Sequence, residues 1–164
     1  MRRTLPFVLV LALAACGSGD DRVAATTTST TEPGEACSSL VLSDNRTDDQ
    51  PDLPDAVAAT RAAIIDAALA CDFERLEELS LAGDGTFNYS FGQPGPAGLA
   101  DHLRAREAEG EELSRILVET FRLPFQDQQI PDGDRYVSWD HADPLYYRAG
   151  ITEAGDWMYF VAGD

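Results

Sequence analysis

The sequence contains no lysine, so all twelve of its basic residues are arginine, and they stand against 29 acidic residues. The formal net charge at pH 7 is therefore -17. Because proteins bind phosphate backbones with clustered Lys and Arg side chains, this composition argues against nucleic acid as a partner. The absence of lysine also excludes enzymes that form a Schiff base between a lysine and their substrate.

The motifs of several common enzyme classes are also missing. The chain has no Gly-x-Ser-x-Gly, no His-Glu-x-x-His, no Cys-x-x-Cys and no Gly-rich loop that ends in Gly-Lys-Ser or Gly-Lys-Thr. It has only two histidines, His102 and His141. His102 lies close to Arg104 and Arg106 in a predicted helix, which is typical of a charged, solvent-exposed face. We therefore expect a protein that is not an enzyme, uses no cofactor and holds no metal.

The N-terminus lacks an apolar run long enough to span a bilayer, which takes roughly 20 residues. A short apolar run over residues 5–15 follows the positive start Met1-Arg2-Arg3, and this order is typical of an export signal. The run leads into Leu13-Ala14-Ala15-Cys16, which resembles the lipobox of bacterial lipoproteins. The resemblance implies cleavage before Cys16 and a diacylglyceryl group, with acyl chains such as palmitate, on its thiol. The alternative is an ordinary secretory signal in which Cys16 stays unmodified.

The residues after Cys16 have the composition of a flexible tether. Residues 17–35 read GSGDDRVAATTTSTTEPGE, which is rich in Thr, Ser and Gly and has little to bury. Loss of the signal peptide leaves ten basic against 29 acidic residues, a net charge of -19. We predict a signal peptide at 1–15, a lipidated cysteine and tether at 16–52, and one globular domain at 53–164. The expected location is extracytoplasmic, with the cell membrane as a partner through the lipid anchor.

The other two cysteines, Cys37 and Cys71, form an even pair in a chain that is predicted to be exported. Such a pair is most simply a disulfide, which would stabilise the fold by roughly 3 to 4 kcal/mol because it restrains the unfolded chain. In the alternative interpretation, Cys71 is a small buried hydrophobic residue and Cys37 is free.

Apolar periodicity predicts a two-layer α+β domain. Helical spacing predicts a hairpin of two helices, the first over 54–70 and the second capped by Asp72 and ended by Gly83. Further helix is predicted over 97–122, split at Gly110, and a loop over 126–134. Alternating residues predict strands at 86–92, 135–140, 145–151 and 157–162. Together these elements indicate helices packed on a mainly antiparallel sheet of about four strands.

The run AIIDAALACDFERLEEL at 63–79 resembles the start of nuclear-transport-factor-2-like and cystatin-like domains. In those domains a curved sheet wraps around a helix, and the resemblance implies the same arrangement here. It carries no catalytic or ligand-binding motif of its own.

The densest group of chemically active residues is Trp139-Asp140-His141-Ala142-Asp143. Its two carboxylates flank an imidazole at the end of a predicted strand, where a hard cation or a general base would fit. Asp140, His141 and Asp143 are therefore the candidate catalytic residues. The alternative is a polar loop whose Asp side chains accept backbone hydrogen bonds in turns.

Aromatic residues are concentrated in the predicted strands, and alternation places some of them on the face away from the helices. Most will pack in the core, but rings on both faces would also suit a pocket or an interaction patch. The candidate ligand-binding residues are Trp139, Arg148 and Trp157. The sequence thus favours a lipid-anchored, non-enzymatic domain that binds an envelope protein. The alternative is a small pocketed ligand-binding protein or enzyme that uses Asp140, His141 and the sheet aromatics.

Overall fold

The structure is a computed structural model, and it describes residues 37–41, 50–83, 87–89, 97–129, 135–140 and 147–163. All of them belong to one unit within Pro33–Asp164. The helical elements are η1 (Ser38–Val41, a 3-10 helix), α1 (Asp55–Ala70), α2 (Phe73–Leu81), α3 (Leu99–Ala108) and α4 (Leu113–Arg122). The strands are β1 (Asn88–Tyr89), β2 (Gln126–Gln129), β3 (Arg135–Asp140), β4 (Tyr147–Thr152) and β5 (Trp157–Ala162). The predicted α+β class is confirmed.

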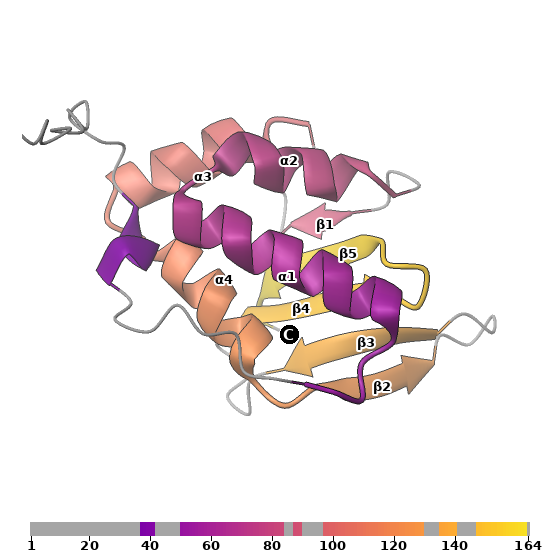
Figure 1. Cartoon of the computed structure of the whole chain (residues 1–164). Helices are drawn as coiled ribbons and strands as arrows, with labels where there is room; N and C mark the ends of the chain where they lie inside the picture. The colour runs from indigo at the N-terminus through magenta and orange to yellow at the C-terminus, as the bar shows by residue number, and fades with distance from the viewer. Residues whose placement is uncertain are drawn as a thin grey trace, which may run out of the picture. The chain divides into compact units, whose positions relative to one another are not determined.

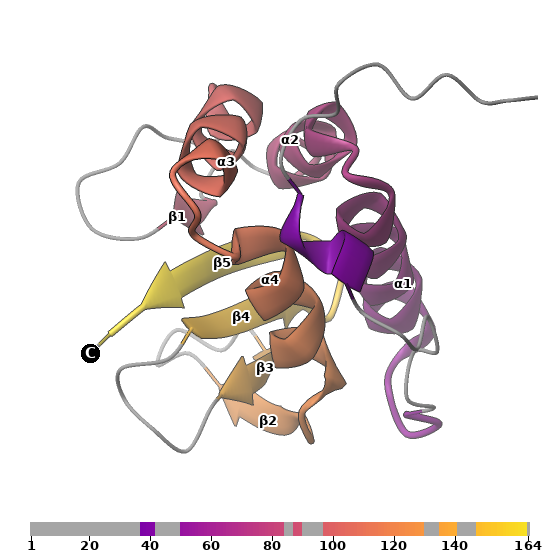
Figure 2. The same ribbon diagram turned by 90° about the vertical axis from the view of Figure 1, so that its left-hand side faces the viewer.

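The strands form a five-stranded sheet in the order β1-β5-β4-β3-β2. Neighbouring strands from β2 to β5 pair antiparallel, and β1 pairs with β5 in parallel. α1 and α4 lie across the middle of the sheet, and α2 lies near β5 (Figure 1). Figure 2 shows the helices as a layer of their own beside the strands. The mainly antiparallel sheet with packed helices follows the prediction.

The core lies between these two layers. On β3, Val137 and Trp139 face the helices, and their cross-strand partners Ile151 and Ala149 lie on the same face of β4. Phe160 continues this face on β5. All five are at most 1% exposed. The helices contribute fully buried apolar residues that share the predicted faces, among them Val57, Ile64, Ile65, Ala68, Phe73, Leu76, Leu117, Val118 and Phe121.

The predicted helical hairpin is present as α1 and α2. Cys71 ends α1 in the left-handed backbone region, with φ 58, and its N–H bonds to the carbonyl groups of the last turn. The Asp72 side chain then accepts a hydrogen bond of 2.9 Å from the N–H of Arg75, so the predicted cap of α2 is confirmed.

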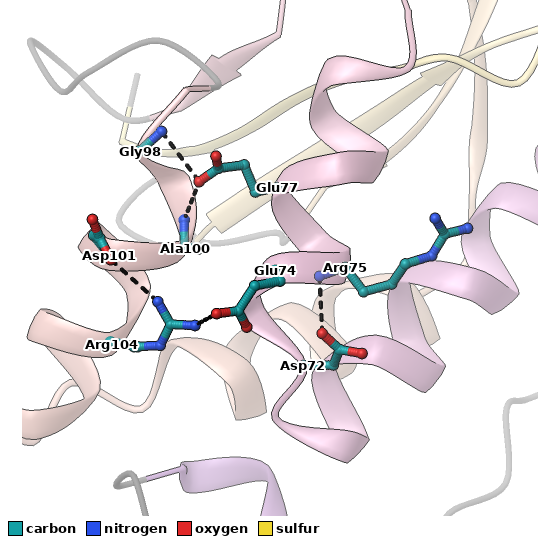
Figure 3. A network of polar contacts seen from close by, with 8 residues as sticks. All are labelled: Asp72, Glu74, Arg75, Glu77, Gly98, Ala100, Asp101 and Arg104. Carbon is teal, nitrogen blue, oxygen red and sulfur yellow. Dashed lines mark hydrogen bonds and ion pairs between the residues drawn. The ribbon is translucent and has the colours of Figure 1, made fainter. Parts of the chain in front are cut away.

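Side-chain contacts also join α2 to α3 (Figure 3). The Glu77 carboxylate accepts hydrogen bonds from the N–H groups of Gly98 at 3.1 Å and Ala100 at 2.9 Å. It therefore satisfies free donors at the start of α3 and places a negative charge there. On the next turn of α3, Arg104 forms an ion pair with Glu74 of α2.

Two strands differ from the prediction. The segment Gln126–Gln129 was predicted to be part of a loop, and this was wrong because it forms β2. Its sequence, QDQQ, does not alternate apolar and polar residues. β2 lies at the edge of the sheet, where most of its side chains are exposed, and backbone pairing with β3 holds it in place. The strand predicted at 86–92 is described only as Asn88–Tyr89.

The segment Cys37–Val41, which we call the N-terminal strap, is fixed to the helices. A disulfide joins Cys37 to Cys71, as the sequence predicts. η1 lies against α1 and α4, and the Ser39 hydroxyl donates a hydrogen bond of 2.6 Å to the carbonyl group of Ala68. The folded unit therefore includes residues on the N-terminal side of the predicted domain start at residue 53.

A buried carboxylate holds the strap from the other side. Glu107, on α3, is only 4% exposed. It accepts hydrogen bonds from the N–H of Ser38 at 2.8 Å, the Ser38 hydroxyl at 2.9 Å and the N–H of Ser114 at 2.6 Å. The Ser38 Oγ in turn accepts one of 3.0 Å from the N–H of Arg115. One side chain thus connects the strap, α3 and the first turn of α4.

Candidate functional site

The alternation of the strands divides the candidate residues between the two faces of the sheet. Trp139 and Trp157 lie on the helix side and are 0% and 3% exposed. Their indole N–H groups donate hydrogen bonds of 3.1 Å to Gln50 Oε1 and to the carbonyl group of Tyr159. Trp139 also meets the ring of Phe121 edge-on, with centroids 4.8 Å apart. Both tryptophans are therefore packed in the core and offer almost no surface to a ligand.

Asp140 and Arg148 lie on the other face of the sheet, which we call the outer face. They are cross-strand partners on β3 and β4. The buried Ser138, two residues before Asp140, donates a hydrogen bond of 2.9 Å to Asp140 Oδ2. Arg148 Nη2 donates one of 2.8 Å to the carbonyl group of Gly163. The structure thus brings together two of the residues that the sequence singled out.

The ring of Tyr159 covers Gly150 on the outer face. A Cβ atom on Gly150 would lie 2.4 Å from Cε1 of Tyr159, so the ring occupies the space that any other residue would fill. Burial raises the pKa of the Tyr159 phenol, and the negative charge of Asp140 raises it further. The phenol therefore stays protonated at neutral pH and can donate a hydrogen bond beside the carboxylate.

We expect Gly150→Ala to lower the free energy of unfolding by about 1 to 3 kcal/mol, because the added methyl group displaces the Tyr159 ring. Denaturant titration followed by circular dichroism measures this cost. In a Tyr159→Ala background the same substitution should cost much less, because the ring that the methyl group meets is gone. Equal costs in both backgrounds would show that this contact is not the cause.

The remaining candidates are not brought into the site by the structure. His141, Asp143 and Cys16 lie outside the described residues. Within the described ranges, no group of three or more His, Cys, Asp or Glu side chains is arranged to hold a metal ion. None of the helices in this part of the chain has the length and apolar character needed to cross a bilayer.

A second group of polar side chains, missed by the sequence reasoning, lies between α3 and the β1 edge of the sheet. We call it the tyrosine cluster, and its members are Tyr89 on β1, His102 and Arg106 on α3, Glu111 before α4, and Tyr147 on β4. The ring centroids of Tyr89 and His102 are 5.0 Å apart, edge to face. The rings of Tyr89 and Tyr147 both pack against Phe160 of β5, with centroids 6.1 and 4.6 Å from its ring.

The charges of the tyrosine cluster come from one end of α3. Arg106 Nε donates a hydrogen bond of 2.9 Å to Glu111 Oε2, and the guanidinium also pairs with Glu109 at 3.0 Å. Burial raises the pKa of the Tyr89 phenol, and the nearby Tyr147 raises it further. Burial, assisted by the Arg106 charge, lowers the pKa of His102. The two phenols and the imidazole are therefore uncharged at neutral pH.

The sequence carried only part of the signal for this cluster. It placed His102 and Arg106 four residues apart, and therefore on one helix face, but this face was interpreted as solvent-exposed. In the structure His102 is partly buried against Tyr89. The two tyrosines come from strands on either side of β5, so no local pattern connects them.

Comparisons with known proteins found no match. No family model matches the chain, and neither a curated protein nor a solved structure matches it.

Proposed function

We propose that the chain is a bacterial lipoprotein, held at the outer side of the membrane by acyl chains on Cys16, whose domain binds a partner in the cell envelope rather than catalysing a reaction. The observation that carries this proposal is Leu13-Ala14-Ala15-Cys16 at the end of a short apolar run that follows two arginines. Two acyl chains hold a protein firmly on a bilayer, whereas a single chain gives only marginal binding.

The disulfide supports an extracytoplasmic location. Structural disulfides persist in oxidising compartments and are rare in the cytosol of most organisms, where thiols are kept reduced. Cys37 lies within the predicted tether at 16–52, directly after the Thr- and Ser-rich residues 17–35, and its bond to Cys71 joins it to the helices. It gives the tether a firm attachment to the folded unit, as a domain held by its N-terminus requires.

The charge of the chain supports a protein partner rather than the lipid surface. At -19 after removal of residues 1–15, which leaves ten basic against 29 acidic residues, the domain is repelled by anionic headgroups. About 20 residues separate Cys16 from the strap, and they would reach about 65 Å if fully extended. A partner that stands away from the bilayer is therefore within reach.

Metabolic labelling with an alkyne analogue of palmitate tests the anchor. We expect the wild-type protein to be labelled and to fractionate with membranes, and Cys16→Ser to be unlabelled. The matched control is the double variant Cys37→Ser/Cys71→Ser, which should keep its label because Cys16 is the cysteine of the lipobox-like motif. An unlabelled wild type, a labelled Cys16→Ser variant or a wild type found in the cytosolic fraction would contradict the proposal.

One observation favours the alternative, a small-ligand protein or enzyme that uses Asp140, His141 and the sheet aromatics. On the outer face, the Asp140 carboxylate receives a hydrogen bond from Ser138 and lies opposite Arg148. Thermal-shift measurements against a panel of metals and metabolites separate the two candidates. A stabilising ligand whose effect disappears in Asp140→Asn and in His141→Ala would favour the alternative, and an unchanged melting temperature favours a macromolecular partner.

A further inference from the structure

We propose that the outer face of the sheet binds a neutral glycan chain. The rings of Tyr136 and Tyr159 stack on its sugar units, and the side chains of Asp140 and Arg148 bond to its hydroxyl groups. This inference goes beyond the proposed function, because it assigns a class of ligand to one face of the sheet. It does not depend on the lipid anchor, and it leaves the helix layer to a protein partner.

The outer face is the side of the sheet that the described helices do not cover. They pack on the opposite face (Figure 1 and Figure 2). Charged residues make up 25% of the chain, yet within the described strands Asp140 and Arg148 are the only two on the outer face, and their charges are opposite. Strand register places on this face Asn88, Gln126, Gln128, Tyr136, Ser138, Asp140, Arg148, Gly150, Thr152, Tyr159 and Val161. The face is therefore close to neutral and rich in hydroxyl, amide and aromatic groups.

Two tyrosine rings meet over the middle of this face. Tyr136 of β3 and Tyr159 of β5 come from either side of β4, and their ring centroids are 6.1 Å apart at an interplanar angle of 75°. Gly150 of β4 leaves room for this contact, because a Cβ atom there would lie 2.4 Å from Cε1 of Tyr159. Both tyrosines remain partly exposed.

This ring pair suits a pyranose. The C–H groups of a sugar ring carry a slight positive charge and are attracted to the negative face of an aromatic ring. Since the rings of Tyr136 and Tyr159 are close to perpendicular, a sugar that stacks on one of them meets the other along its side. The pair therefore favours a sugar ring over a flexible apolar chain, which has no such flat face.

A polar pair lies on the same face, one register step along β3 and β4. Asp140 and Arg148 are cross-strand partners. Among the described residues, Asp140 Oδ2 accepts a bond of 2.9 Å from the Ser138 hydroxyl, and Arg148 Nη2 donates one of 2.8 Å to the carbonyl group of Gly163. A carboxylate and a guanidinium can each form several hydrogen bonds, so both keep capacity for a ligand. Sugar hydroxyl groups donate and accept, which matches an acceptor and a donor that lie side by side.

The spacing of these groups suits a chain of sugars rather than a single one. They come from β3, β4 and β5, which are neighbours in the sheet. Strands in a sheet lie about 4.8 Å apart, close to the length of one pyranose unit, so roughly two or three sugars that cross the strands cover all of these groups.

The charge of the chain selects a neutral glycan over an acidic one. A formal net charge of -17 repels polyanions such as uronic acid chains. On the outer face, the basic Arg148 lies opposite the acidic Asp140, so this face offers no excess of positive charge to an anionic ligand. A neutral glycan avoids that electrostatic cost.

The test is a nuclear magnetic resonance titration of the ¹⁵N-labelled, full-length protein with three neutral hexasaccharides, namely cellohexaose, maltohexaose and chitohexaose. We expect at least one of them to give saturable shifts of backbone amide signals, confined to β3, β4 and β5. For that sugar type, the trisaccharide should bind about 10-fold more tightly than the monosaccharide, and the hexamer little more tightly than the trisaccharide. A galacturonic acid hexamer, which is anionic, should bind at least about 10-fold more weakly.

Substitutions on the outer face test the two rings. Tyr136→Ala and Tyr159→Ala should each weaken binding by about 10-fold, because each removes a stacking surface. Tyr136→Phe should stay within about 2-fold of the wild type, because it keeps the ring. Glu78→Ala is the matched control, since this side chain is 66% exposed and lies on α2. Circular dichroism confirms that each variant is folded.

The map of shifted amides needs no variant and so does not depend on how the substitutions fold. The proposal is overturned if none of the three hexamers gives saturable shifts, if the shifted residues lie on the helices, or if folded Tyr136→Ala and Tyr159→Ala bind like the wild type. Outer-face shifts that appear on concentrating the protein without sugar would assign the face to a second copy of the chain and overturn it as well. Its failure would leave the proposed lipoprotein function standing, because the titration does not involve Cys16.

Discussion

Glu107→Ala is expected to lower the free energy of unfolding by about 3 to 5 kcal/mol. The side chain is 4% exposed and accepts three hydrogen bonds, two from Ser38 and one from the N–H of Ser114. Its loss leaves these donors without their acceptor in a place that water enters poorly, and an unsatisfied buried donor costs about 1 to 3 kcal/mol. Denaturant titration of the purified domain measures the effect.

Two other variants test whether the buried carboxylate is the cause of this loss of stability. The free energy of unfolding of Glu107→Gln should lie between those of the wild type and Glu107→Ala. The amide keeps one acceptor oxygen, but it turns its NH₂ group toward a backbone or hydroxyl donor. Glu78→Ala is the matched control, since its side chain is 66% exposed and pairs with Arg75 one turn away. It should change the stability by less than about 0.5 kcal/mol. A Glu107→Ala protein as stable as the Glu78→Ala control would show that the carboxylate does not hold the strap.

Removal of the disulfide in Cys37→Ala/Cys71→Ala is expected to lower the free energy of unfolding by about 3 to 4 kcal/mol. The bond closes a sequence separation of 34 residues, and its loss gives the unfolded chain that freedom back. The measurement is a denaturant titration of wild type and variant, each with and without a reducing agent. Reduction should shift the wild type toward the variant and leave the variant unchanged.

Mass spectrometry supplies the covalent check on this bond. After alkylation under denaturing conditions, the wild type should gain two additional alkyl groups only if it has first been reduced. Equal masses with and without reduction would show that Cys37 and Cys71 are not bridged in the purified protein. A bridged protein whose stability did not change on reduction would instead contradict the expected energetic effect.

The helices were the most predictable part of the fold. Their apolar residues recur every three to four positions because one stripe of each helix faces the core, and the buried residues Ile64 and Ile65 of α1 and Leu117 of α4 follow that rule. β3 and β5 were equally clear from alternation and strand-forming residues. β2 was missed because an edge strand is held by backbone hydrogen bonds, which leave no mark on the side-chain pattern.

The positions of the candidate residues could not be predicted from the sequence. Trp139 and Asp140 are adjacent in the chain, yet strand geometry sends one into the core and the other to the outer face. Their proximity in sequence had suggested one site. The proximity of Tyr89 and Tyr147 was invisible for the opposite reason, because it depends on which strands are neighbours in the sheet.

The sequence by itself determined the charge of the chain, its lack of lysine, the positions of its helices and the α+β class, because these depend on composition and on short-range periodicity. The lipobox and the resemblance to nuclear-transport-factor-2-like and cystatin-like domains stay predictions. Only the tertiary structure decided that Glu107 is buried beneath the strap, that Tyr159 lies over Gly150, and that Tyr89 meets His102 of α3. Such contacts join elements that are far apart in the chain, so they arise from strand order and from the packing of helices on the sheet rather than from local pattern.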